Sequence, residues 1–329
     1  MRILVTGGAG FIGGHLVGRL LDDGHTVHIV DNLSSNPIPM ARLLNEIGNA
    51  AISATVFQES IEVFSLYQQP LYRRARYDAI FHLASPVGPA GILPHAGKII
   101  QQVVSDAYRV IDLAKHNGAR LIDVSTSEVY GGGQDGLCSE DMRKHIPAQM
   151  TARVEYAVAK LAAEAAILNS ADLDALIVRP FNVAGPRQSA KGGFVLPRFV
   201  GQAMRGEALT VFGSGMQIRA FTHVRDIVDG MVRAWERGRT GAVYNLGNPA
   251  NTTTILDLAQ QVMAVIGQGE VVFTNGKAIY GPQYAEADDK YPDSRKAETE
   301  LGWQPSIGIR ATIRDVYEYE QAKEAELCR

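Results

Sequence analysis

Cysteine is scarce in this sequence, whose 329 residues include only Cys138 and Cys328. Two cysteines in a chain of this length cannot form the disulfide framework of a small secreted domain. Neither has a histidine or a second thiol at the spacing of a metal site, and the eight histidines are scattered. Long apolar runs are missing as well, because none approaches the ~18 residues of a membrane-spanning helix. The sequence therefore predicts neither a metal site nor a membrane span.

An excess of charge of one sign is also lacking. The formal net charge is −3, and basic residues form no cluster of the kind that binds nucleic acid or an acidic membrane surface. Hydrophobic residues make up 46% of the chain and charged residues 20%, which allows a large core and excludes general disorder. The opening residues, MRILVTGG, run directly into a predicted strand and glycine turn. We therefore expect no signal peptide and a soluble, cytoplasmic protein.

Strand-like and helix-like stretches alternate through the first half of the chain. The strand-like runs are residues 3–5, 26–30, 79–83, 121–124 and 175–178, and the helix-like stretches are residues 11–22, 98–117 and 156–169. This alternation is typical of an α/β fold, with a doubly wound parallel sheet covered by helices on both faces. The second half alternates shorter strands and helices, and it predicts a smaller C-terminal α/β domain. Residues 274–292 are polar and rich in turn formers, which predicts a long functional loop.

A glycine pattern follows the first predicted strand. Gly7, Gly10 and Gly13 lie between this strand and the first predicted helix, where residues without a β-carbon let the backbone approach a pyrophosphate. The helix N-terminus offers free amides to the phosphates. Asp31, at the end of the second strand, is placed to accept hydrogen bonds from ribose hydroxyls and disfavours a ribose phosphate. These features predict a Rossmann-type domain that binds NAD rather than NADP.

A phenol and an ammonium group are spaced for catalysis on the last predicted helix of this half. Tyr156 and Lys160 are four residues apart and share a helix face, so Lys160 is predicted to lower the pKa of Tyr156 toward that of a general base. The hydroxyl and carboxyl groups of residues 125–128 follow a predicted strand directly. Ligands bind at this end of parallel strands.

With these motifs, the chain resembles the extended short-chain dehydrogenase/reductases that act on nucleotide sugars. The matching segments run in order along the whole chain: residues 7–13, 31–33, 82–84, 125–131, the pair Tyr156 and Lys160, and residues 179–187, 219–224, 245–249 and 301–305. The resemblance implies the catalytic residues Thr126, Glu128, Tyr156 and Lys160. It implies NAD contacts from Gly7, Gly10, Phe11, Ile12, Gly13, Asp31, Asn32, Leu83, Ala84, Tyr156 and Lys160. It implies substrate contacts from Ser127, Asn182, Arg187, Arg219, Tyr284 and Lys290.

Within this family, residues 82–86, 125–130, 280–284 and 290–292 resemble UDP-glucuronate decarboxylases. In the implied chemistry, NAD oxidises carbon four of the sugar, and the resulting ketone, which is β to the carboxylate, allows carbon dioxide to leave. Thr126 and Tyr156 would stabilise the developing oxyanion, and Glu128 is predicted as the acid, or the holder of the water, that reprotonates carbon five. Lys290 is predicted to hold the substrate carboxylate. The product would be a UDP-pentose or a UDP-4-keto-pentose.

Three departures separate this chain from those decarboxylases. Lys290 stands where they carry an arginine, which keeps the cation but loses its bidentate geometry. Phe194 replaces an arginine, and Ser60 replaces an aspartate that contacts adenine. Three alternatives therefore stay open: a nucleotide-sugar 4-epimerase, including one for uronic acids, a 4,6-dehydratase, and a dinucleotide-binding sensor without catalysis.

The resemblance also implies how the chain is divided and assembled. We expect the NAD-binding domain at residues 1–181, with a returning segment at about 221–247. The nucleotide-sugar-binding domain is expected at residues 182–220 and 248–329. The apolar faces of the helices predicted at 98–117 and 156–169 imply a homodimer with a four-helix interface.

Overall fold

A computed structural model describes residues 1–34, 43–45, 48–64, 76–132 and 136–327 of the chain; Cys328 lies outside these residues. Its centre is a seven-stranded parallel sheet with the strand order β12-β7-β5-β4-β1-β2-β3. The strands are β1 (Arg2–Thr6), β2 (Thr26–Val30), β3 (Ala54–Phe57), β4 (Ala79–His82), β5 (Arg120–Val124), β7 (Ala175–Pro180) and β12 (Val243–Leu246). This confirms the predicted doubly wound α/β fold.

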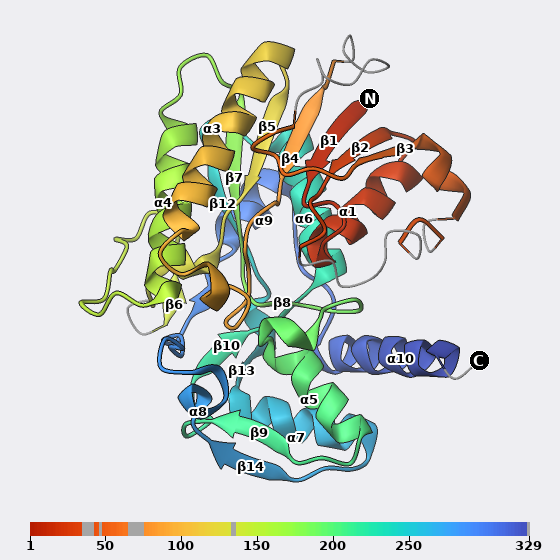
Figure 1. Cartoon of the computed structure of the whole chain (residues 1–329), viewed down its shortest axis with the longest axis vertical. Helices are drawn as coiled ribbons and strands as arrows, with labels where there is room; N and C mark the ends of the chain where they lie inside the picture. The colour runs from red at the N-terminus through yellow and green to blue at the C-terminus, as the bar shows by residue number, and fades with distance from the viewer. Residues whose placement is uncertain (35–42, 46–47, 65–75, 133–135, 328–329) are drawn as a thin grey trace.

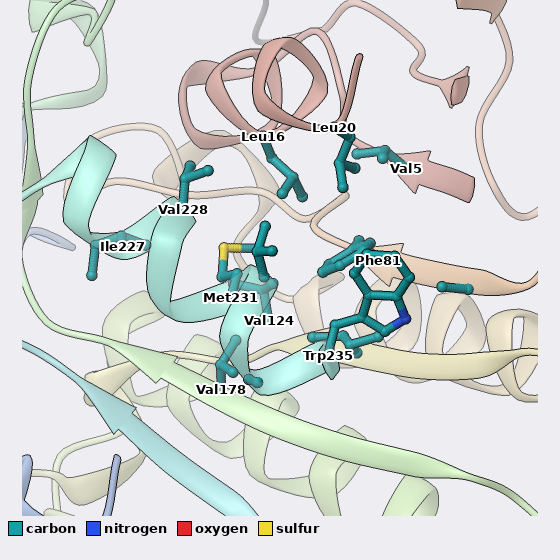
Figure 2. Packing of buried hydrophobic residues seen from close by; sticks show 14 of the residues in the cluster. Val5, Leu16, Leu20, Phe81, Val124, Val178, Ile227, Val228, Met231 and Trp235 are labelled. Carbon is teal, nitrogen blue, oxygen red and sulfur yellow. The ribbon is translucent and has the colours of Figure 1, made fainter. Parts of the chain in front are cut away.

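One face of the sheet is covered by α1 (Phe11–Asp22) and α6 (Val224–Arg237), with α9 (Arg295–Leu301) beside α6. Figure 2 shows how Leu16 and Leu20 of α1 approach Met231 of α6 above the strand residues Phe81 and Val124. All five side chains are buried. Because apolar residues repeat along both helices at the helical period, each helix buries one stripe against the sheet.

The opposite face is covered by α3 (Ile99–Asn117) and α4 (Ala152–Leu168), which pack against each other as well as on the sheet (Figure 1). Successive residues of a strand point to opposite faces. On β5, Leu121 joins the core beneath α3 and α4, whereas Ile122 and Val124 join the core beneath α1 and α6. Side chains on the α4 face of β5 therefore lie close to the helix that carries Tyr156 and Lys160.

A smaller group of elements lies beyond the carboxyl ends of the strands, in the lower part of Figure 1. It has its own core, formed mainly by α5, α7 and α10 with β9. The helices here are α5 (Val195–Met204), α7 (Ile255–Ile266), α8 (Gly276–Tyr280) and α10 (Ile309–Leu327). The short strands are β6 (Leu137–Cys138), β8 (Val183–Ala184), β9 (Leu209–Phe212), β10 (Ile218–Ala220), β11 (Thr222–His223), β13 (Thr252–Thr254), β14 (Val271–Thr274) and β15 (Tyr291–Pro292).

Two segments differ from the sequence prediction. Helix α4 begins at Ala152, four residues before Tyr156, because the Thr151 hydroxyl caps it by accepting a hydrogen bond from the Val154 amide. The segment 274–292 is not a continuous loop, because it contains α8 and ends in β15, which pairs with β6. The earlier start of α4 adds Arg153 to this helix, and β15 begins directly after Lys290.

None of the helices in the described ranges combines the length and the apolar character that a membrane crossing requires. The cytoplasmic location stays a prediction.

Candidate active site

A cavity of about 980 Å³ lies along the carboxyl ends of the central strands, between the sheet and the smaller group of elements. Its walls come from the first glycine turn, the ends of β2, β4 and β5, helix α4 and the segment 284–287. It includes all the predicted NAD contacts, the four predicted catalytic residues, and Ser127, Asn182, Arg219 and Tyr284. Arg187 and Lys290 are not among the residues that line it.

The glycine turn forms one end of this cavity. Gly7 has a φ of +69°, and a β-carbon on Gly13 would lie 2.1 Å from the Gly7 carbonyl oxygen. Gly10 precedes α1, whose first turn has no side-chain cap and no acidic residue. The amides of this helix end therefore face the cavity with their positive dipole uncompensated by side chains. This cradle fits a pyrophosphate.

A fixed carboxylate stands beside the glycine turn. Asp31 accepts hydrogen bonds from the backbone amides of Ala9 (2.9 Å) and Leu33 (2.8 Å). These bonds hold the carboxylate at the end of β2, where it lines the cavity together with Asn32. A carboxylate at this place accepts hydrogen bonds from ribose hydroxyls and repels a ribose phosphate. The cavity, the phosphate cradle and this acid together fit a dinucleotide.

The Tyr156 side chain lines the cavity and is almost fully buried. It forms hydrogen bonds with the hydroxyls of Thr126 and Ser85, and these bonds lower its pKa. Burial and the carboxylate of Glu128 outweigh them, so that the pKa of Tyr156 is raised well above its ordinary value. Lys160 donates to the Val124 carbonyl oxygen at 3.0 Å. The predicted lowering of the Tyr156 pKa is therefore wrong for this structure, because desolvation is the stronger effect.

Glu128 is held between two cations. Its carboxylate accepts a hydrogen bond from Arg153 at 2.8 Å and forms a second ion pair with Lys290. Although burial alone would raise its pKa, these two cations hold the pKa of Glu128 far below its usual range. Because an ionised carboxylate has no proton to give, this pairing argues against the predicted acid role. It leaves Glu128 the alternative role of holding a water molecule.

Arg153 is a site residue that the sequence analysis missed. Its guanidinium group bonds Glu128 and also donates from Nε to the Ala285 carbonyl oxygen at 3.0 Å. The sequence did contain a signal, since Arg153, Tyr156 and Lys160 are spaced i, i+3 and i+7 and so share one face of α4. Without knowing that α4 begins at Ala152, this face could not be extended to Arg153.

The predicted substrate residues lie in different surroundings. Asn182 has a φ of +35° and donates to the Ala220 carbonyl oxygen at 3.2 Å. Arg219 is buried and donates to the carbonyl oxygens of Ala287 (2.6 Å) and Asp288 (3.1 Å). Tyr284 donates to Glu286 at 2.9 Å. The Asn182 bond ties the segment after β7 to β10, and the Arg219 bonds tie β10 to the segment 284–290.

Lys290 lines a second, smaller cavity of about 210 Å³ next to the first. Glu128 and Arg153 line both cavities. Lys290 contacts the lining of the main cavity through its ion pair with Glu128 and through a backbone bridge to Arg219. Arg187 lies outside both linings and has a φ of +72°. Ser60 and Phe194, the two other departures noted in the sequence, both line the main cavity.

A model of the NAD dependent epimerase/dehydratase family matches residues 3–247. UDP-glucuronic acid decarboxylase 1 of Xenopus tropicalis is 34% identical over 322 residues, which are 97% of this chain and 72% of that protein. UDP-N-acetyl-alpha-D-glucosaminuronate decarboxylase of Bacillus cytotoxicus is 31% identical over 95% of this chain and 97% of its own length. The crystal structure of UDP-glucuronic acid 4-epimerase from Bacillus cereus, in complex with UDP-glucuronic acid and NAD, superposes with a TM-score of 0.83 at 27% identity, covering 98% of this chain and 100% of that one.

Proposed function

This chain belongs to the NAD-dependent epimerase/dehydratase family, and on that premise we propose that it decarboxylates UDP-glucuronate through a 4-keto intermediate. The product would be a UDP-pentose or a UDP-4-keto-pentose. The observation that carries this proposal is the cluster of Glu128 with Arg153 and Lys290 beside the hydroxyls of Thr126 and Tyr156. Two cations next to the catalytic hydroxyls suit a sugar that carries a carboxylate. The two relatives named above, both decarboxylases of uronic acid sugars, support the same substrate class.

In this proposal, NAD would be bound by the glycine turn, the start of α1 and Asp31. The amides at the start of α1 would bind the pyrophosphate of NAD, with Gly7, Gly10 and Gly13 allowing its close approach. Asp31 would bind the adenosine ribose. When bound, NAD supplies the oxidising power for the sugar carbon that bears the 4-hydroxyl group.

The protein's own groups would handle the protons and the developing charge. Thr126 and Tyr156 would hold the oxygen on carbon four. Tyr156 would take its proton in the phenolate form, which burial and Glu128 disfavour in the free protein. Once that oxygen belongs to a ketone, both hydroxyls can donate to it while the electron pair released with carbon dioxide moves onto it. Glu128 would hold the water that returns a proton to carbon five.

Arg153 and Lys290 would bind the sugar carboxylate in this scheme, in partial exchange for Glu128. An arginine fork and an ammonium group both form charge-assisted hydrogen bonds with carboxylates. The buried Arg219 adds a further positive charge to this end of the cavity and would bind the diphosphate. A UDP-linked uronic acid offers negative charge at both of these places.

A 4-epimerase acting on the same uronic acid is the second candidate. It is favoured by the superposition on the UDP-glucuronic acid 4-epimerase, whose own ligands are UDP-glucuronic acid and NAD. The Thr126 and Tyr156 pair would serve both reactions, because both begin with oxidation at carbon four. The cation cluster fits either enzyme, and the fate of the carboxylate distinguishes them.

The decisive experiment is a mass measurement of the products. The protein is incubated with NAD and, separately, with UDP-glucuronate, UDP-N-acetylglucosaminuronate, UDP-glucose and UDP-galactose. Decarboxylation removes about 44 mass units when the product is a UDP-pentose and about 46, with NADH formed, when it is a UDP-4-keto-pentose. Dehydration removes about 18, whereas epimerisation changes retention without changing mass. Tyr156→Phe is the negative control. Turnover of UDP-glucose or UDP-galactose without any reaction of either uronic acid sugar would contradict the proposal.

We also propose that the two ligands bind to the two domains expected from the sequence. Residues 1–181 and 221–247 would hold NAD, and residues 182–220 and 248–329 the nucleotide sugar. We propose a homodimer through α3 and α4, whose outer faces expose Ile100, Tyr108 and Leu168.

A further inference from the structure

An asparagine at the end of the central sheet connects two segments that are far apart in the chain. Asn245 is on β12, is fully buried, and is not among the residues that line either cavity. Its side-chain oxygen accepts a hydrogen bond from the Tyr130 hydroxyl at 2.6 Å. Its side-chain nitrogen donates to the carbonyl oxygens of Cys138 at 3.0 Å and Asp293 at 3.1 Å. The oxygen and both hydrogens of this amide are therefore used.

One of the two segments carries Glu128. The short helical turn Ser127–Tyr130 contains Glu128 two residues before Tyr130. The Tyr130 ring is fully buried, and its hydroxyl also accepts a hydrogen bond from Arg179 of β7 at 2.9 Å. Because Asn245 and Arg179 are partners in register, two neighbouring strands of the central sheet hold the Tyr130 hydroxyl. The turn that carries Glu128 is thereby anchored to the sheet.

The other segment carries Lys290. Strand β15 follows Lys290 directly, and the Asp293 carbonyl group comes immediately after that strand. The end of β12 and β15 approach each other closely, because a β-carbon on Gly247 would lie 2.4 Å from Cγ of Pro292. The Ser294 hydroxyl adds a hydrogen bond to the Gly247 carbonyl oxygen at 2.8 Å. The residues just after Lys290 are thus held against the end of β12.

These contacts form a closed ring around an ion pair of the site. Glu128 and Lys290 bond each other directly, and the segments that carry them meet again at Asn245. A buried ion pair is favourable only when its geometry is well held, because its charges have left water. Residues 245–249 are one of the segments that resemble the family, yet they line neither cavity. The ring gives this segment a role at the site.

We propose that Asn245 is a positioning residue that fixes the separation between the backbones of Glu128 and Lys290, and so keeps the two side chains within bonding reach. It acts through Tyr130 on one side and through the end of β15 on the other. Under the proposed function, on which the kinetic part of this inference rests, the same bonds keep Lys290 where the substrate carboxylate binds.

Hydrogen exchange followed by mass spectrometry tests this role without a substrate. Asn245→Ala removes the bonds to both segments, whereas Tyr130→Phe removes only the bond to the turn that carries Glu128. The peptides covering 127–131 and 288–293 both contain backbone amides that are hydrogen-bonded in the structure. In Asn245→Ala we expect both peptides to exchange about tenfold faster, as local opening allows. In Tyr130→Phe the acceleration should be confined mainly to 127–131.

Asn251→Ala is the matched control. Asn251 is also buried and also uses its whole amide group. It donates to the carbonyl oxygens of Phe221 at 3.0 Å and Ile307 at 2.9 Å, and it accepts from the Ile309 amide at 2.9 Å. These bonds lead to the segment before α10 and not to Glu128 or its turn. Its loss should leave the exchange of 127–131 and 288–293 unchanged.

Double-mutant kinetics give the second readout, which a merely structural role would not move. We expect Asn245→Ala to raise KM for UDP-glucuronate about fivefold, the effect of losing a buried hydrogen bond at the site. In a chain that already carries Lys290→Ala, the same substitution should leave KM unchanged, because both changes disable one contact. Tyr130→Phe should show the same dependence on Lys290, which covers the case that Asn245→Ala folds poorly.

Two results would overturn the positioning role. One is a KM effect of Asn245→Ala that multiplies with that of Lys290→Ala. The other is equal exchange of 288–293 in Asn245→Ala and Asn251→Ala. A native protein that does not bind UDP-glucuronate would contradict the proposed function alone, since the exchange measurement still decides the role of Asn245.

Discussion

At the scale of single residues, Glu128 depends on two cations for its ionised state. Its carboxylate is shared by Arg153 and Lys290, which come from α4 and from the end of the segment 284–290. The family resemblance implied roles for Glu128 and Lys290 at the substrate carboxylate, but their ion pair joins residues 162 positions apart and could not be derived from local pattern. The same holds for the Tyr156 pKa, since helical spacing reveals the ammonium four residues away and not the burial that outweighs it.

Lys290→Ala is expected to raise KM for UDP-glucuronate about tenfold, because one of the two cations for the sugar carboxylate is lost. NAD binding should be unaffected, since Lys290 pairs with Glu128, whereas Asp31 is held by backbone amides next to the glycine turn. Steady-state kinetics and NAD titration check both statements. Lys277→Ala, an exposed lysine of α8, is the matched control. Equal KM values in Lys290→Ala and Lys277→Ala would remove Lys290 from the substrate site.

Asp31→Ala is expected to weaken NAD binding by tenfold or more and to reduce the preference for NAD over NADP. The carboxylate would otherwise bind the ribose hydroxyls and repel a ribose phosphate. Calorimetric titration of both cofactors into the native protein and the variant measures the two affinities. Equal affinity of the native protein for NAD and NADP would contradict the role given to Asp31.

At the scale of elements, most of the central sheet could be predicted and the connecting segments could not. The strand β2 and the helix α1 have the bounds that the sequence indicated, because a continuous apolar run and a clear helical period mark them. Helix α4 starts earlier than its apolar pattern because Thr151 caps it. β15 is too short to be read from sequence, since it exists only through its pairing with β6, some 150 residues earlier.

The outer faces of α3 and α4 would form the interface of the proposed homodimer. Tyr108 is 57% exposed on α3, and in the proposed homodimer such a residue lies in an apolar four-helix interface. Tyr108→Arg should therefore convert a dimer into a monomer, as measured by sedimentation at micromolar concentration. Phe273→Arg, on the exposed strand β14, is the control and should leave the mass unchanged. A native protein that is already monomeric would contradict the dimer.

At the scale of the whole molecule, buried histidines and buried carboxyls shift stability in opposite directions. Burial lowers the pKa of His15 and His28 to about 4 and that of His82 to about 3, below the unfolded value of about 6.5. Protonation below pH 6.5 therefore favours the unfolded state. Asp106 and Asp123, whose pKa values burial raises to about 7 and about 6, become less destabilising as they take up protons in the same range.

Since the three histidines outnumber the two aspartates, we expect Tm of the native protein to fall between pH 7 and pH 5. The fall should be steeper in Asp123→Asn, which has lost one of the compensating groups. Calorimetric scans at half-unit steps of pH measure both slopes. A native Tm that rises on acidification would show that the carboxyl groups dominate.

The ion pairs of Glu128 also bear on how a catalytic cycle would end. Under the proposed function, the substrate brings its own carboxylate to Arg153 and Lys290, and the product no longer has one. Glu128 lies within bonding reach of both cations, so it can reclaim them as soon as carbon dioxide has formed. The protein thus contains an internal competitor for the substrate carboxylate, and the product, which has no carboxylate, cannot displace it. This arrangement favours rapid release and weak product inhibition.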